Sequence, residues 1–122
     1  MRLRERVLVT FAHPDIGFSI PDKSGTAVAH GGAVLQCEDD TKATLLCVLA
    51  HRDEQMLRTH AYWLVLLCAT VGLADAEPWI ASELRAAATG ERKSVRMIEG
   101  FRFTLSIDHP PRTVLLQVEV VR

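Results

Sequence analysis

The segment from Val95 to Val121 alternates apolar and polar residues, and it constrains the fold more than any other part of the chain. Up to Ile107 the apolar residues occupy odd-numbered positions, and from Val114 onward they occupy even-numbered positions. Alternation with a period of two is typical of strands that bury one face. We therefore predict a C-terminal β-hairpin over this segment, and we interpret an interruption at residues 99–100 as a β-bulge.

The change of parity limits how the two strands of the hairpin can pair. A shift of one residue would turn one apolar set to the opposite face. Among the allowed registers, the one with a loop at residues 109–112 also opposes Arg102 to Glu119 on the other face. An exposed ion pair contributes at most about 1 kcal/mol, so burial of the apolar face decides the fold. The predicted apolar pairs are Phe101 with Val120, Phe103 with Val118, Leu105 with Leu116 and Ile107 with Val114.

Shorter patterns in the first half of the chain predict additional strands. Val7, Val9 and Phe11 occupy alternate positions, as apolar residues of a strand do. Proline, glycine and aspartate occur between the predicted strands, where each favours a turn. The predicted strands are 6–11, 16–20, 26–30, 33–37 and 43–49, and the predicted turns are 13–15 and 38–42.

Two helices are predicted before the C-terminal hairpin. Asp53 is a suitable N-cap for the first helix, and Gly72 is a suitable end. Residues 62–71 of this helix are apolar on nearly all sides, which indicates burial on all sides. We expect the second helix, or a second copy of the chain, to cover the side that the sheet does not. The second helix is predicted over residues 75–89, with a proline in its first turn.

The length of 122 residues fits a single domain, residues 1–122, with one hydrophobic core. Hydrophobic residues make up 48% and charged residues 24%, which excludes an intrinsically disordered chain. The formal net charge of -1 gives no overall attraction to nucleic acid or to an anionic membrane. Together with the strand and helix patterns above, they predict an α+β domain: an antiparallel sheet of five or six strands with a two-helix hairpin inserted before the C-terminal β-hairpin.

Cysteine usage favours a reducing compartment. Cys37, Cys47 and Cys68 cannot all pair within one chain, and their wide spacing does not resemble a secreted disulfide scaffold. The N-terminal segment lacks the apolar stretch of a signal peptide, and the longest apolar run is too short to cross a bilayer. We expect a cytoplasmic protein with no membrane partner. The excess of arginine over lysine, with many alanines, is typical of a GC-rich bacterial or phage genome.

No motif in the sequence combines the residue types and the spacing that catalysis requires. Cys47, His51 and His60 are candidate metal ligands, but they include no Cys-x-x-Cys pair and no His-Glu-x-x-His helix. A Gly-x-Ser-x-Gly nucleophile elbow is absent, and Cys68 falls in the most apolar helical stretch. We therefore predict no catalytic residue, no metal ligand and no cofactor, and we favour a protein that is not an enzyme.

Five residues are candidates for contact with a partner. Trp79, at the start of the second helix, is either an exposed anchor or a core residue. Arg92, Arg96 and Arg102 form a basic group at the start of the hairpin region. Leu115 is an apolar residue on the otherwise polar face of the hairpin. An extended partner segment could also add to the edge of the hairpin.

The leading functional hypothesis is a non-catalytic protein-binding module. Small inhibitors, immunity proteins, phage anti-defence proteins and assembly subunits are of this kind, and a homodimer is an alternative. A second hypothesis is a small-molecule-binding domain or small enzyme, with a pocket between helices and sheet that uses His51 or His60. A third is nucleic-acid binding through the arginines at residues 2–6 and 92–102, although interleaved glutamates favour a solvated surface.

Overall fold

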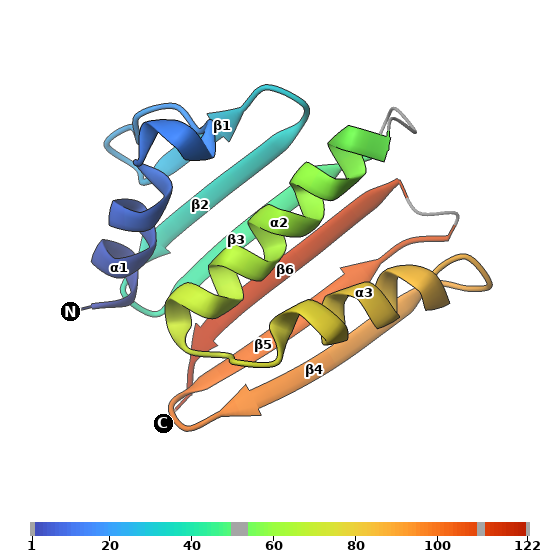
Figure 1. Ribbon diagram of the computed structural model, residues 1–122. Helices are drawn as coiled ribbons and strands as arrows, with labels where there is room; N and C mark the ends of the chain where they lie inside the picture. Colours follow the sequence, from blue (N-terminus) through green and yellow to red (C-terminus); the bar gives the residue numbers. More distant parts are fainter. Residues whose placement is uncertain (1, 50–53, 110–111, 122) are drawn as a thin grey trace.

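The computed structural model describes residues 2–49, 54–109 and 112–121, which fold into an antiparallel sheet with helices on one face (Figure 1). The sheet has six strands in the order β1-β2-β3-β6-β5-β4. The elements are α1 (Leu3–Phe11), a 3₁₀ turn η1 (Pro14–Ile16), β1 (Thr26–Ala29), β2 (Ala33–Asp39), β3 (Lys42–Val48), α2 (Glu54–Val71), α3 (Ala76–Ala86), β4 (Arg92–Ile98), β5 (Phe101–Ile107) and β6 (Thr113–Val120). The predicted α+β class is confirmed, with the α2–α3 hairpin between β3 and β4.

The predicted register of the C-terminal hairpin is confirmed. Ile107 pairs with Val114 and Arg102 pairs with Glu119, so β5 and β6 align as the apolar parity requires. Phe103, Leu105, Leu116 and Val118 are almost completely buried on the helix side of the sheet. The guanidinium of Arg102 lies 3.4 Å from the carboxylate of Glu119 on the opposite face.

The prediction of a bulge at residues 99–100 is wrong, because these residues form a turn between two strands. Gly100 has a φ of 89°, which an L-residue rarely adopts, and Ile98 pairs directly with Phe101. The turn reverses the chain and also changes which parity faces the helices. Val95 and Met97 therefore lie on the face away from the helices, where they are 49% and 59% exposed. The C-terminal unit is a three-stranded meander rather than one hairpin.

The first predicted strand is also wrong, since this segment forms helix α1. Leu3, Val7 and Phe11 are four residues apart, which places them on one side of a helix, and all three are buried. Val9, which a strand would have placed with Val7, is 65% exposed. The apolar residues of this segment fit both the two-residue spacing of a strand and the four-residue spacing of a helix. The helix forms because it buries Leu3, Val7 and Phe11 against β2 and β3.

The predicted strand at residues 16–20 is replaced by η1 and an irregular segment. Pro14 begins the 3₁₀ turn, and Gly17 leaves it with a φ of 94°. An isolated bridge between Phe18 and Ala29 and a hydrogen bond from the Val28 backbone N–H to Ser19 Oγ join this segment to β1. Ile20 is 90% exposed. Strands β1, β2 and β3 confirm the predicted strands 26–30, 33–37 and 43–49, and each boundary agrees to within two residues.

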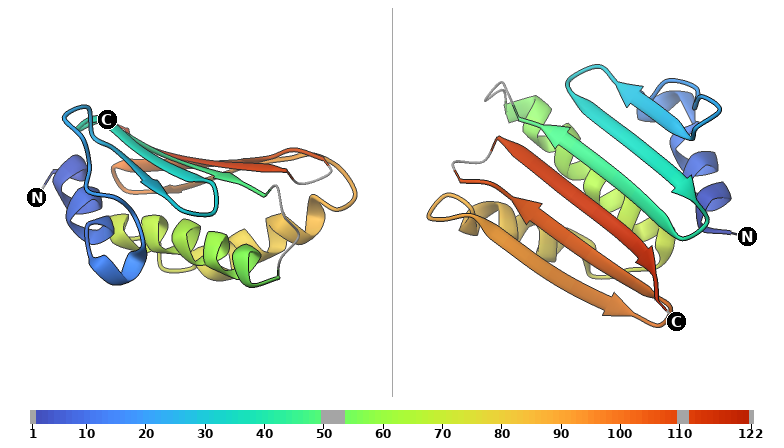
Figure 2. Two further views of the ribbon diagram at one scale, coloured as in Figure 1. Left: turned by 90° about the horizontal axis from the view of Figure 1, so that it is seen from above. Right: turned by 180° about the vertical axis from the view of Figure 1, so that it is seen from behind.

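Helix α2 lies over the middle of the sheet and runs along the strands, with α1 on one side and α3 on the other (Figure 1; Figure 2). This arrangement accounts for its apolar second half: Leu67 and Cys68 are fully buried, and both neighbouring helices belong to the same chain. Tyr62 is 50% exposed, so the prediction of burial on every side is too broad. The helix ends at Gly72, and Leu73 donates its backbone N–H to the carbonyl of Cys68. The N-cap residue Asp53 lies outside the described residues.

Replacing Phe103 should test the importance of the helix-covered face. Phe103→Ala removes a fully buried ring and should lower the free energy of unfolding by about 3–5 kcal/mol, measured by urea denaturation. Thr104→Ala, next to it on the opposite face, should cost roughly 0.5 kcal/mol or less. Equal losses in the two variants would contradict this assignment of the two faces.

Candidate binding surfaces

Trp79 is part of the core between α3 and β4, as the alternative interpretation of this residue predicted. Its side chain is almost entirely buried, and its indole Nε1–H donates to Ser94 Oγ at 2.9 Å. Ser94 faces the helices because the Glu99–Gly100 turn places the even-numbered residues of β4 on that side. Trp79 is therefore not available as an exposed anchor.

Arg92 and Arg96 face the same side and pair with carboxylates of the α3 region. Arg92 Nε donates to Glu83 Oε2 at 2.8 Å, and this guanidinium holds the pKa of the Glu83 carboxyl below its usual range. Arg96 lies 3.5 Å from the carboxylate of Asp75 and 5.8 Å from the centre of the Trp79 ring. Both arginines thus contribute to the packing of α3 on β4.

Leu115 and Arg102 lie on the opposite side of the sheet, which we call the outer face. Viewed edge-on, all three helices lie on one side of the sheet and this face is open (Figure 2). Leu115 pairs with Leu46, Leu46 with Val34, and Val34 with Val28, so these four side chains form one line across β6, β3, β2 and β1. We call this line the aliphatic row. Val28 and Val34 are 50% and 37% exposed.

Two further rows on the outer face run beside the aliphatic row. The middle row carries hydroxyl and amide side chains, followed by one valine: Thr26, Gln36, Thr44, Gln117, Thr104 and Val95. The far row carries charges, then a methionine: Lys42, Glu119, Arg102 and Met97. Toward β4 the aliphatic row itself ends in Ser106 and Lys93. The aliphatic row is thus bordered by neutral polar groups and by a cation.

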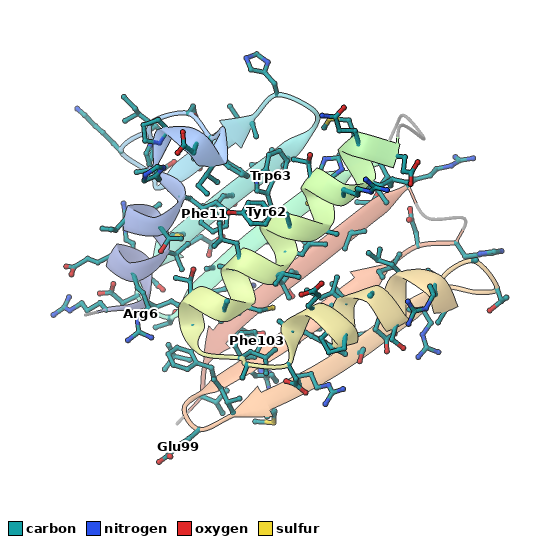
Figure 3. All side chains as sticks on the ribbon, viewed as in Figure 1. Arg6, Phe11, Tyr62, Trp63, Glu99 and Phe103 are labelled. Atoms are coloured by element: carbon teal, nitrogen blue, oxygen red, sulfur yellow. The ribbon has the colours of Figure 1, made fainter. Side chains whose placement is uncertain are left out.

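The predicted hairpin has only one strand, β4, at an edge of the described sheet. β6 pairs with β3 and β5 pairs with β4, so neither β5 nor β6 is an edge strand; the edges of the described sheet are β1 and β4. The two arginine groups are also apart, because α1 packs near β2 while β4 lies at the far edge of the sheet (Figure 1). Arg2 pairs with Asp40 at 3.0 Å, and Arg6 projects from α1 rather than from a strand (Figure 3). The arginines at residues 2–6 and those at residues 92–102 therefore do not form one basic patch.

A cavity of about 210 Å³ opens between α2, α3 and the sheet. Figure 1 shows the two helices diverging from their connection near Gly72, and the cavity lies at the divergent end. The described residues that line it are apolar except for one imidazole: Leu49, Leu57, His60, Ala61, Leu64, Leu84 and Val114. The sheet and the two helices therefore border an apolar cavity, and His60 is the one titratable side chain among the described residues that line it.

His60 is 3% exposed and is held by the β1–β2 turn. Its Nε2 lies 2.8 Å from the carbonyl oxygen of Gly31, and its ring packs against Trp63, labelled in Figure 3, at 5.4 Å between centres. Burial lowers the pKa of His60, which favours the neutral ring. Nδ1 is buried and has no hydrogen-bond partner among the described residues.

The remaining reactive side chains show no catalytic or metal-binding arrangement in the part of the chain that the structure describes. There is no group of three histidine, cysteine or acidic side chains that could hold a metal ion among these residues, and His51 lies outside them. Burial raises the pKa of Cys37 to about 11 and of Cys47 and Cys68 to about 12. These thiols are therefore protonated and unreactive at neutral pH.

Comparison with known proteins identifies no family model, no curated protein and no solved structure that matches this chain. Among the described residues, no helix has both the length and the apolar character needed to cross a membrane. The fold, the outer face and the cavity between α2, α3 and the sheet are therefore the basis for any functional assignment.

The Glu83–Arg92 pair gives a pH-dependent contribution to stability. Because the pKa of Glu83 is lowered in the folded state, this contribution is present above the unfolded value near 4.5 and is lost as the pH falls through the lower folded value. Glu83→Gln should lower the free energy of unfolding by roughly 1–2 kcal/mol at pH 7, since the exposed side of Arg92 is screened by solvent.

The difference between Glu83→Gln and the wild type should shrink below about pH 4, measured by urea denaturation across the pH range. Glu77→Gln is the matched control, because Glu77 is exposed on the same helix. A loss for Glu83→Gln that is the same at pH 3 and pH 7 would show that the pair contributes through packing alone.

Proposed function

We propose that the protein is a non-catalytic binding module that holds a partner protein against its outer sheet face. The aliphatic row of Val28, Val34, Leu46 and Leu115 carries this proposal. Single apolar residues are common on protein surfaces, whereas a contiguous patch bordered by polar groups is typical of an interaction site. An antiparallel sheet with one solvated face normally presents polar residues there, so the row is a departure from that pattern.

The arrangement of the outer face favours a partner of particular chemistry. Neighbouring strands lie about 4.8 Å apart, so the row from β1 to β6 extends roughly 14 Å. That length matches about ten residues of an α-helix lying across the strands. The partner would place its apolar side on the row, its polar groups against Gln36 and Gln117, and a carboxylate near Lys93.

This function suits a small inhibitor, an immunity protein, a phage anti-defence protein or an assembly subunit. Three free, buried cysteines are consistent with a reducing cytoplasm. A second copy of the chain is an alternative occupant of the outer face, and it would make the protein a homodimer.

Val34→Glu should abolish partner binding because it places a charge in the middle of the aliphatic row. Gln36→Glu is the matched control, since it introduces the same charge on the same strand and face but in the polar row. Both variants should remain folded, with melting temperatures within a few degrees of the wild type. The measurement is quantitative affinity capture with the three proteins as baits, followed by mass spectrometry.

A partner captured at near-stoichiometric level by the wild type and by Gln36→Glu, but not by Val34→Glu, would support the proposal. Capture that is equal for all three baits, or the absence of any near-stoichiometric protein, would contradict it. Sedimentation analysis should show a monomeric wild type. A dimer that Val34→Glu dissociates would instead assign the outer face to a second copy of the chain.

A further inference from the structure

The two edge strands of the sheet differ in whether their outward main-chain groups are satisfied. In β1, Val28 donates its backbone N–H to Ser19 Oγ at 3.0 Å, and its carbonyl oxygen accepts the N–H of Ser19 at 2.7 Å. Thr26 makes an equivalent pair of hydrogen bonds with Asp22, both at 3.0 Å. The segment before β1 thus closes this edge, which prevents another chain from pairing with it.

The hydrogen bonds at the two ends of β5 show which groups of β4 point away from the sheet. The carbonyl of Gly100 accepts from Val121, and the N–H of Asp108 donates to Thr113, so even-numbered residues along β5 bond toward β6. Main-chain groups alternate between the two sides of a strand, so the odd-numbered residues of β5 bond to the even-numbered residues opposite them in β4. The groups at the free edge therefore belong to the odd-numbered residues of β4: Lys93, Val95 and Met97.

This edge of β4 is open and regular. Among the described residues, no hydrogen bond uses the outward N–H or C=O groups of β4. Figure 2 shows β4 at the margin of the sheet, with no other described segment beyond it. The strand has seven residues, contains neither proline nor glycine, and pairs with β5 without a register shift. Such an edge is a template for pairing with an extended segment of another chain.

The side chains of β4 favour an acidic segment over a second copy of the chain. The strand carries Arg92, Lys93 and Arg96 and no carboxylate. Cations on an edge strand disfavour pairing with a like strand, because like charges in opposed positions are destabilising. Lys93 has no ion pair among the described residues, and the two arginine side chains remain 45% and 47% exposed beside their carboxylates. A segment with carboxylates would be attracted to this edge, whereas a second copy would add the same cations again.

We propose that β4 accepts an extended acidic segment of a partner protein as an additional antiparallel strand. The segment bonds through its main chain to Lys93, Val95 and Met97. Its residues opposite Val95 and Met97 lie on the outer face and are apolar, and those opposite the cations are glutamate or aspartate. The contact does not use the aliphatic row, so it holds or fails independently of the function proposed above.

The probe is an acetylated and amidated peptide with the sequence Thr-Val-Glu-Val-Thr-Glu-Glu. Paired antiparallel to β4, it places valine opposite Met97 and Val95 and glutamate opposite each cation. It should bind with a dissociation constant below about 1 mM, measured by nuclear magnetic resonance titration of the ¹⁵N-labelled protein. The amide signals of Lys93, Val95 and Met97 should move more than those of Ser94 and Arg96, whose N–H groups already bond to β5.

Methylation of the peptide nitrogens separates main-chain pairing from simple charge attraction. N-methylation of both valines removes two N–H groups directed at β4 and should weaken binding at least about tenfold. N-methylation of the first glutamate and the second threonine is the matched control, because these N–H groups point away from β4. This control peptide should bind within about twofold of the unmodified one.

Variants of the protein test the same edge from the other side. Val95→Pro removes one outward N–H without breaking a bond to β5, so the protein should stay folded and bind the peptide at least about fivefold more weakly. Val95→Thr keeps the N–H and should bind as the wild type does. Lys93→Glu should also weaken binding about fivefold, whereas Lys23→Glu makes the same charge change before the closed β1 edge and should not. Val34→Glu, on the aliphatic row, should retain peptide binding.

The methylated peptides and Lys93→Glu test the proposal even if Val95→Pro does not fold. The proposal is overturned if the peptide does not bind at millimolar concentration, or if the two methylated peptides bind equally. It is also overturned if Lys93→Glu and Lys23→Glu bind the peptide equally, or if a folded Val95→Pro binds it as the wild type does. A wild-type dimer that Val95→Pro dissociates would assign the edge to a second copy of the chain instead.

Discussion

The structure depends on a buried row of four leucines that joins strands from both halves of the chain. Leu35, Leu45, Leu116 and Leu105 are paired in sequence across β2, β3, β6 and β5, and each is at most 1% exposed. Burial of such a side chain contributes about 2 kcal/mol, and a slip of one residue in any of the three pairings would expose it. The leucine row therefore sets the registers of the four central strands at once. The same registers align Val34, Leu46 and Leu115 of the aliphatic row on the outer face.

β4 differs from the central strands because its polar residues face the helices. The leucine row ends at Ser94, which accepts the hydrogen bond from Trp79, and Arg92 and Arg96 lie on either side of it. Glu83 and Asp75 supply the opposing carboxylates. Helix α3 thus covers this strand through hydrogen bonds and ion pairs in addition to apolar contact. The consequence is that Val95 and Met97, which would belong to the core in an ordinary edge strand, face outward.

The parts of the fold that were predictable from the sequence are those set by local patterns. The register of β5 and β6 follows from a parity change within twenty residues, and α2 follows from its apolar period and the glycine that ends it. The segment of α1 satisfies two periods, because Val7 and Phe11 are spaced for either a helix or a strand. Only its packing against distant strands selects the helix. At residues 99–100, a turn and a bulge are equally compatible with the local sequence. The two alternatives place the side chains of β4 on opposite faces of the sheet.

The candidate sites were less predictable, for a related reason. Leu115 was identifiable as an apolar residue on a polar face, but its neighbours in the aliphatic row come from three other strands. Their alignment depends on the pairing of β3 with β6, which no local pattern specifies. The available signal was that Val34 and Leu46 alternate with buried residues of the same strand. Similarly, His60 was recognisable as a polar residue on an apolar helix, whereas its cavity requires the divergence of α2 and α3.

The burial of all three thiols makes the folded chain nearly inert to thiol-specific reagents. Cys37 and Cys47 lie on central strands and Cys68 on the central helix, so a reagent reaches them only when the main body of the protein opens. The rate at which these residues are labelled should therefore report the opening of the core directly. A single cysteine introduced on the surface would react first, and would allow a probe to be attached at one chosen point without removal of the native three.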